Sequence, residues 1–229
     1  MKILYMSWFS SGEGSKIHAQ EFTRAMKNLG HTVINRDLSI RRGSLSAGSP
    51  NSPAVNSNML KNFLREFKSI IMAILRYMSK NKPDLIIYRY TIYDLSGIFV
   101  GKLFRIPVIY EVNGSVEYER EISGRYYFKR LVRSNEKYIF EHADLVLLVS
   151  NELKSYFEKK NYNIENTLIV PNGVDIERFS QNIPLPKDLQ KIKDDLSDKK
   201  VIGFTGSLKS WHGAERIIDI LPEIIKVVP

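Results

Sequence analysis

The sequence of 229 residues contains no cysteine, which excludes disulfide scaffolds and thiolate metal sites. It also has no run of about 18 apolar residues, the length that a membrane-spanning helix needs. Its most apolar stretch, residues 98–110, is interrupted by Lys102 and Arg105. The first residues lack an apolar segment followed by a small-residue cleavage site, so no secretory signal is recognisable. These absences predict a cytoplasmic protein.

Charge and composition narrow the class of protein further. The chain has 34 lysines and arginines against 25 aspartates and glutamates, a formal net charge of +9. This excess favours an anionic partner: a phosphate-bearing substrate, an acidic membrane surface or a nucleic acid. No helix-turn-helix, zinc-finger or RNP signature is recognisable, so we expect no nucleic-acid partner. An apolar fraction of 43% is high enough to form a folded core.

Short apolar runs alternate with longer amphipathic stretches. A helix is predicted where apolar residues recur every three or four positions over 22–29, with Gly30 as its C-cap, and Asn151 is expected to cap another. The repeated strand–helix order predicts an α/β fold with a Rossmann-like, doubly wound parallel sheet. The runs typical of buried strands are 2–7, 32–35, 84–90, 107–112, 144–150 and 167–170.

Two polar stretches interrupt this pattern. Residues 41–58 are rich in Ser, Asn, Gly and Pro and are predicted to form a loop within the first domain. Residues 180–200 are predicted to link the domain formed by 1–179 to a second one, in which 201–207 forms a strand and 211–228 a helix. A single strand–helix unit cannot bury both its faces, so we expect the second domain, 201–229, to be incomplete.

The first turn of the predicted sheet holds a candidate anion site. Gly12, Gly14 and Ser15 precede a helix expected to open near Lys16, and glycines let backbone N–H groups approach a ligand closely. The third glycine of a dinucleotide fingerprint and the spacing of a Walker A loop are both missing. A connection without ligand significance is the alternative. His18 is open to two interpretations, a solvated or core-edge histidine or a functional one.

Five segments in this order resemble glycosyltransferase family 4, the large retaining group with the GT-B fold. The resemblance implies an acceptor-binding first domain and a second domain that binds a nucleotide sugar, with the present chain being the first domain and the start of the second. It covers nearly the whole chain. The segments are LGHTV at 29–33, PVIYEVNG at 107–114, HADLVLLVS at 142–150, VPNGVD at 170–175 and IGFTGSLKSWHG at 202–213.

The resemblance also implies site residues. Asn113 stands at the end of the fourth strand, where the family often has a histidine, and is the expected catalytic position, with Gly114 beside it. The implied acceptor- or phosphate-binding residues are therefore Gly12, Gly14, Ser15 and Gly114. The implied donor-binding residues are Gly206, Ser207, Lys209 and His212, with Ser207 and His212 replacing the family's usual arginine and lysine. Helix N-termini and basic side chains would hold the diphosphate, so no metal and no cofactor is expected.

The expected activity is transfer of a sugar from a nucleotide-sugar donor to a glycan or lipid-linked acceptor, with retention, without metal, and in polysaccharide or glycolipid biosynthesis. The chain by itself is expected to be inactive. The alternative is a non-catalytic binding or assembly module that docks on a partner, and the exposed helix near the end of the chain could also pair two copies. The apolar stripe at 59–78, which carries basic residues, suggests either a helix on the membrane surface or a core helix with a solvated basic face. Residues 118–137 interleave basic and aromatic residues, which suggests either a surface for anionic lipid or nucleic acid or a helix with one buried aromatic face.

Overall fold

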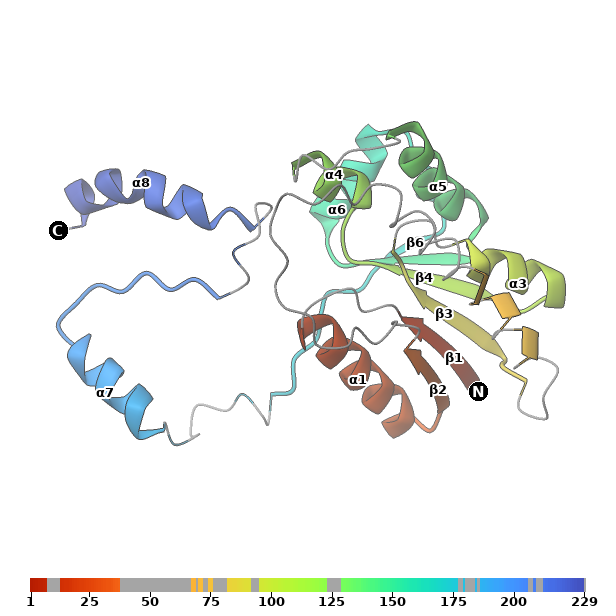
Figure 1. Ribbon diagram of the computed structural model, residues 1–229, viewed down its shortest axis with the longest axis horizontal. Helices are drawn as coiled ribbons and strands as arrows, with labels where there is room; N and C mark the ends of the chain where they lie inside the picture. Colours follow the sequence, from red (N-terminus) through yellow and green to blue (C-terminus); the bar gives the residue numbers. More distant parts are fainter. Residues whose placement is uncertain are drawn as a thin grey trace. The chain divides into compact units, whose positions relative to one another are not determined.

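A computed structural model shows an α/β architecture built on parallel strands (Figure 1). Contacts divide the chain into two units, residues 1–120 with 126–171, and residues 121–125 with 172–229. The structure describes residues 1–7, 13–37, 67–68, 70–71, 74–75, 82–91, 95–122, 129–176, 179, 184, 186–205, 208 and 212–228.

The first unit holds a six-stranded sheet in the order β2-β1-β3-β4-β5-β6, with all neighbours parallel. The predicted parallel, Rossmann-like fold is therefore confirmed, and every strand falls within or next to a predicted apolar run. Strand β2 pairs with one edge of β1, and β3 pairs with the other edge of β1. The strands are β1 (Lys2–Ser7), β2 (Thr32–Asp37), β3 (Leu85–Arg89), β4 (Val108–Val112), β5 (Leu145–Leu148) and β6 (Thr167–Ile169).

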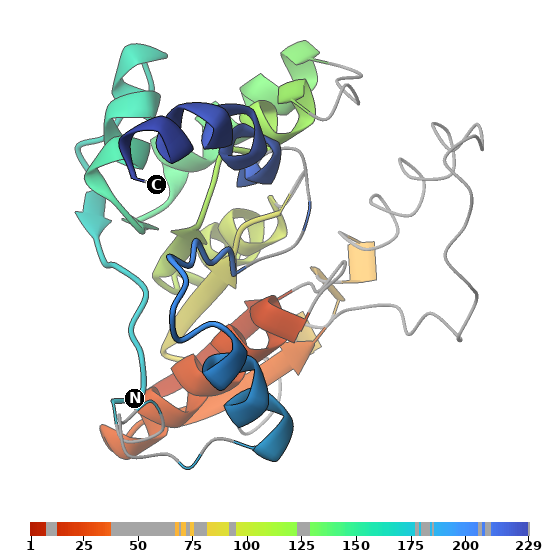
Figure 2. The same cartoon turned by 90° about the vertical axis from the view of Figure 1, so that its left-hand side faces the viewer.

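Helices follow the strands along the chain. Helix α1 lies along β1 and β2 in both views (Figures 1 and 2). The helices that lie wholly or mostly in the first unit are α1 (Glu13–Asn28), α3 (Ser96–Phe104), α4 (Val116–Ile122), α5 (Lys129–His142) and α6 (Asn151–Lys159). In the second unit the structure describes α7 (Lys187–Asp195) and α8 (Ala214–Val227).

Side chains alternate between the two faces of the sheet, as they must in strands. On one face, Ile3 and Tyr5 of β1 pack with Ala19 of α1. On the other, Leu4 and Met6 belong to a larger cluster that includes residues of α3, α5 and α6. Burial on both faces explains why the strands read as continuous apolar runs instead of alternating ones.

The helix ends differ in detail from the sequence prediction. Gly30 is the C-cap glycine expected: its φ is +82°, and its N–H and that of His31 bond to the carbonyls of Lys27 and Met26. Helix α1, however, begins at Glu13 and not near Lys16. The cap of α6 is Ser150 and not Asn151, because the Ser150 hydroxyl accepts the N–H of Leu153 at 3.2 Å.

The second unit differs most from the prediction. Residues 201–205 form no strand, although the sequence 201–207 has the composition of one. A strand needs neighbours for its backbone hydrogen bonds, and among the described residues of this unit no other strand is present. Helix α8 forms as predicted, yet Ile218, Ile220 and Ile225 are more than half exposed.

Other predictions are tested only in part. The loop predicted at 41–58 lies outside the described residues. In the stripe at 59–78, Ile70 and Ile74 pack against the larger core cluster, as a core helix would. The basic, aromatic stretch at 118–137 is divided between α4 and α5. None of the described helices is both long and apolar enough to cross a bilayer.

Candidate functional site

A cluster of polar side chains lies where β1, β3 and β4 approach their carboxyl ends. Its centre is Glu111, the next-to-last residue of β4, which is only 6% exposed. Because Tyr110 and Val112 belong to the core cluster on the opposite face, alternation directs Glu111 towards α1. A buried carboxylate requires partners, and Glu111 has four of them.

Both carboxylate oxygens of Glu111 are engaged. Oε2 accepts the hydroxyl of Tyr5 at 2.9 Å. Oε1 is 2.7 Å from Nε2 of His18, 2.9 Å from Nη1 of Arg89 and 2.8 Å from Nδ2 of Asn113. These donors come from β1, α1, β3 and the turn after β4, so the carboxylate fixes four segments relative to one another.

The surroundings of Glu111 decide its charge. Burial by itself would raise the pKa of the carboxyl. The hydrogen bond from His18, the positive charges of Arg89 and His18 and the hydrogen bond from Asn113 outweigh burial and leave the pKa below its ordinary value. Glu111 is therefore ionised at neutral pH. Burial and the neighbouring carboxylate raise the pKa of Tyr5, which stays a neutral donor.

The position of the cluster in the sheet is the one where α/β proteins bind ligands. The chain moves to opposite sides of β1 when it forms β2 and β3, which makes β1 and β3 the topological switch point among the described strands. Ligands of open parallel sheets bind outside the carboxyl ends of strands at such a point. The hydroxyl of Ser7, the last residue of β1, is buried and has no partner within the described part of the chain.

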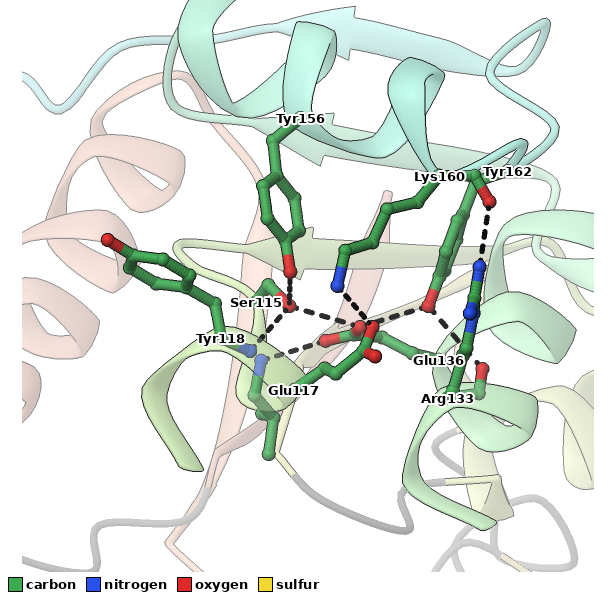
Figure 3. Close-up of polar contacts among 9 residues, drawn as sticks. Ser115, Glu117, Tyr118, Arg133, Glu136, Tyr156, Lys160 and Tyr162 are labelled. Atoms are coloured by element: carbon green, nitrogen blue, oxygen red, sulfur yellow. Dashed lines mark hydrogen bonds and ion pairs between the residues drawn. The ribbon is translucent and has the colours of Figure 1, made fainter. Parts of the chain in front are cut away.

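A second polar cluster holds the turn after β4 in place (Figure 3). The Ser115 hydroxyl caps α4 by accepting the N–H of Tyr118 at 3.2 Å. Glu136 of α5, fully buried, accepts the N–H of Val116 at 2.8 Å, the hydroxyl of Ser115 at 3.2 Å and that of Tyr162 at 3.2 Å. This turn carries Asn113 and Gly114, so the second cluster supports the first.

An ion pair joins α4 to Lys160, the residue that ends α6. Glu117 is 6% exposed, and its Oε2 lies 2.9 Å from Nζ of Lys160. The same ammonium group lies 4.9 Å from the ring centroid of Tyr156.

Burial raises the pKa of Glu136 to about 7, in spite of the hydrogen bonds that it accepts. We regard this second cluster as support for the turn, because its polar atoms are directed at one another (Figure 3).

Of the residues named from the sequence, Asn113 lies in the Glu111 cluster and Gly114 follows it directly. A Cβ on Gly114 would lie 3.2 Å from Oε1 of Glu119, so the position is tight. Gly14 and Ser15 lie in the first turn of α1 rather than in a loop before it. His212 is exposed, two residues before α8. Gly12, Gly206, Ser207 and Lys209 lie outside the described residues.

The sequence reading missed Tyr5, Arg89 and Glu111. A signal was present, because the apolar run at 84–90 holds a basic residue, Arg89, near its end and the run at 107–112 holds an acidic one, Glu111, near its end. In the sheet Arg89 is the direct neighbour of Glu111. His18 turns out to lie against this carboxylate and not at an isolated edge of the core.

Comparison with known proteins gives the family. A sequence model described as Glycosyltransferase Family 4 matches residues 12–178. The chain belongs to glycosyltransferase family 4. Uncharacterized glycosyltransferase MJ1059 of Methanocaldococcus jannaschii is 29% identical over 133 residues, which are 53% of this chain and 32% of that protein. A second protein of that organism, MJ1069, is 30% identical over 90 residues, 22% of its length. The family 4 chain thus spans about a third or less of these relatives.

Solved structures share the fold. The crystal structure of Anabaena Alr3699/HepE in complex with UDP and glucose has a TM-score of 0.60 and 18% identity, and the alignment covers 97% of this chain and 58% of that one. Sucrose-phosphate synthase (tll1590) from Thermosynechococcus elongatus has a TM-score of 0.55 and 19% identity, with 99% and 68% covered. This family 4 chain therefore shares its fold with proteins that are longer than itself.

Proposed function

We propose that this protein takes part in transferring a sugar from a nucleotide-sugar donor to a hydroxyl of a glycan or lipid-linked acceptor, and that its first unit binds the acceptor. The observation that carries the proposal is the Glu111 cluster at the switch point of a family 4 sheet. Asn113 and Gly114 border it, and Gly12, Gly14 and Ser15 are the neighbouring acceptor-side candidates. HepE, whose structure contains UDP and glucose, supports a uridine diphosphate sugar as one donor to test.

A genetic experiment with the natural gene tests this function. Deleting the gene should remove a glycan or glycolipid from the cell, and the gene with Asn113→Ala should restore it poorly, because the acceptor site loses a buried polar contact worth about 1–3 kcal/mol. If the gene with Asn113→Ala restored the glycan or glycolipid as fully as the unchanged gene does, Asn113 would be excluded from the site. An unaltered set of glycans and glycolipids after deletion would contradict the function itself.

The finer chemistry is part of the proposal. The resemblance to family 4 supports retention of the anomeric configuration, which NMR of the product would show. Gly206, Ser207, Lys209 and His212 are the proposed donor-side residues, with backbone N–H groups and Lys209 facing the diphosphate. Within the described residues no group of acidic and histidine side chains is arranged to hold a metal ion. If helix N-termini and basic side chains hold the diphosphate, transfer should continue in EDTA, and loss of transfer that Mg²⁺ restores would contradict metal independence.

We also propose that residues 1–179 form the acceptor domain, that 180–200 are a linker and that 201–229 begin the donor domain. The chain alone should then be inactive, because the described residues after 171 form helices and no strand. Losing several charge-assisted contacts would move a micromolar donor site beyond about 1 mM. Calorimetric titration with uridine, guanosine and adenosine diphosphate sugars should show no saturation below that concentration, and tight binding would refute this division.

A membrane surface is the proposed location of the acceptor. In the first unit, Phe99 and Leu103 of α3 are more than half exposed, and Leu131 of α5 is 47% exposed. Nζ of Lys102 lies 5.7 Å from the ring centroid of Tyr138, which joins a basic group to this apolar surface. Exposed apolar groups next to basic ones suit anionic lipid. Sedimentation with vesicles containing phosphatidylglycerol should carry the protein down, and a Phe99→Ser, Leu103→Ser variant should stay in solution.

A second candidate function, a non-catalytic assembly module, is favoured by α8. Its apolar residues Ile218, Ile220 and Ile225 are exposed within the described structure, and exposed apolar helix faces are usually covered by a partner. Pairing of two copies through α8 is one form of this assembly. Analytical ultracentrifugation should then show a dimer that Ile218→Glu dissociates, whereas a monomer at high protein concentration would contradict pairing.

A further inference from the structure

The hydrogen bonds of Glu111 determine which atoms its neighbours can offer to a ligand. An ionised carboxylate has no proton and can only accept hydrogen bonds. When its imidazole is neutral, His18 must therefore carry its proton on Nε2, the atom 2.7 Å from Oε1 of Glu111. For the same reason Asn113 must direct its amide nitrogen, 2.8 Å away, at the carboxylate.

The remaining polar atoms of these two side chains are then acceptors. A neutral imidazole with its proton on Nε2 has a lone pair on Nδ1. The His18 side chain is 28% exposed although its Nε2 is buried, so the exposure belongs to its other atoms. Asn113 presents Oδ1, which has no hydrogen-bond partner in the described part of the chain. Asn113 Oδ1 therefore requires a donor from outside this cluster, and Nδ1 of a neutral His18 can accept one.

The charges of the cluster decide between the two ligand classes expected at this edge. The positive charge of Arg89 lies directly against the negative charge of Glu111, so neither is left for a phosphate group. His18 lies in the second turn of α1, where the partial positive charge of a helix N-terminus has largely faded. Phosphate oxygens would be repelled by lone pairs on Nδ1 and Oδ1, whereas sugar hydroxyls donate to them.

We propose that Glu111 fixes the tautomer of His18, so that Nδ1 of His18 binds a hydroxyl group of the sugar acceptor. The proposal rests on the proposed function and deepens it: His18 is an acceptor-binding residue, and Glu111 is a positioning residue that acts through it. Asn113, which shares the Glu111 carboxylate with His18, offers Oδ1 as a second acceptor atom. The site therefore selects a neutral polyhydroxyl ligand and rejects a phosphate at this position.

The tautomer is measured on the 229-residue chain without any assumption about activity. Long-range ¹H–¹⁵N correlation spectra at alkaline pH, where imidazoles are neutral, distinguish protonated from unprotonated ring nitrogens. His18 is one of four histidines, and its signals are assigned by their loss in His18→Gln. We expect a protonated Nε2 and an unprotonated Nδ1. The opposite tautomer would overturn the proposal.

Ligand class is tested on the same sample. Methyl glycosides of glucose, galactose, mannose and N-acetylglucosamine are added separately, and so is inorganic phosphate. One or two hydrogen bonds to a small ligand correspond to a Kd of about 10–100 mM, within reach of a titration. We expect at least one glycoside, and not phosphate, to shift the Nδ1 signal. A shift with phosphate only, or with no glycoside at all, would overturn the proposal.

Two variants separate the binding role from a structural one. His18→Gln keeps an N–H donor for Glu111 but removes Nδ1, so it should retain the thermal midpoint and lower glycoside affinity roughly 5- to 100-fold. Glu111→Gln should leave His18 in place but shift it towards the Nδ1–H tautomer and weaken the glycoside response. Unchanged glycoside binding in His18→Gln would refute the contact. A failure to find glycosyl transfer would instead refute the proposed function and leave these spectra standing.

Discussion

At the scale of single residues, the site depends on one buried carboxylate that is shared among several donors. Arg89 and Glu111 keep only 15% and 8% of their side chains exposed. Removing one member of such a pair leaves the other charge with neither water nor partner, which costs more free energy than the intact pair contributes. This asymmetry makes the pair testable by stability measurements.

Glu111→Ala should lower the free energy of unfolding by about 2–4 kcal/mol, because Arg89 then remains mostly buried without its counter-ion. This loss in the free energy of unfolding is somewhat smaller than the loss expected for a fully buried pair, because Arg89 keeps some contact with solvent. Urea denaturation measures the change. The double variant Arg89→Met, Glu111→Leu should recover only part of the loss, because the donors of Tyr5, His18 and Asn113 then lack the carboxylate. A single variant as stable as the parent would mean that the pair contributes nothing to the fold.

The pKa of Glu136 is shifted in the direction opposite to that of Glu111. Burial raises this pKa to about 7 from an ordinary value of 4.5. Between these values the folded state holds a proton that the unfolded state has released, so stability falls as pH rises and levels off above the folded pKa. Glu136→Gln should flatten this slope and exceed the parent's stability above neutral pH by about 1–3 kcal/mol. The amide can still accept the N–H of Val116.

Chemical denaturation at several pH values between about 4 and 8 measures this difference, an interval that brackets both pKa values. The matched control is Glu158→Gln on the exposed side of α6, which should follow the parent at every pH. If the curves of the parent and Glu136→Gln ran parallel, Glu136 would be ionised in the folded protein.

At the scale of elements, the fit of α3 against β4 depends on a glycine. A Cβ on Gly101 would lie 2.8 Å from the carbonyl oxygen of Ile106 and would overlap the side chain of Val108. Backbone and a buried strand residue cannot move aside easily. Gly101→Ala should therefore destabilise the protein by about 1–3 kcal/mol, although alanine favours helix elsewhere.

Thermal unfolding followed by circular dichroism is the measurement for Gly101→Ala. Gly203→Ala is its control, because a Cβ there would meet nothing within 4 Å. The control should unfold at the parent temperature, while Gly101→Ala should unfold several degrees lower. Equal temperatures for both variants would show that α3 can shift away from β4.

Most of the elements of the first unit could be predicted from the sequence, because each parallel strand is buried on both faces and so forms an apolar run. Helix starts were less predictable. Ser150 and Asn151 are both good caps, and only the geometry of the Leu153 N–H decides between them. The strand expected at 201–207 failed for a different reason: its composition was suitable, but pairing depends on neighbours that composition does not reveal.

The site was predictable only in part. Asn113 follows a strand, and strand ends are where ligands bind, so its position could be inferred. Its partners could not, because Arg89 is adjacent to Glu111 only through the register of β3 against β4. His18 contacts the same carboxylate from α1, and it precedes Glu111 by 93 positions in the sequence. Periodicity reports on single elements and contains no information on such contacts.

At the scale of the whole molecule, buried residues are unevenly distributed. Every buried hydrophobic residue among those described lies between Ile3 and Tyr162, and α7 and α8 contain none. Segments with few buried contacts open more easily than a packed core. The two units should therefore differ in their resistance to proteases.

Limited trypsin digestion should remove much of the region after residue 171, which is rich in lysine, and leave a stable fragment containing the first unit. Mass spectrometry identifies the fragment, and circular dichroism should show that it retains a cooperative thermal transition. A fragment that unfolds without cooperativity would show that the first unit depends on the second for its fold. Equal digestion rates in both units would show that they are equally protected.

The strand order has a consequence for the time at which the sheet can form during synthesis. The N–H of Lys2, in β1, bonds to Asp84, which stands 82 positions later and just before β3. At 5–20 residues per second, a ribosome needs about 4–16 s to supply those residues. Until then the apolar side chains of β1 have one strand neighbour at most, so nascent chains should be most prone to aggregation, and most dependent on chaperones, during this interval.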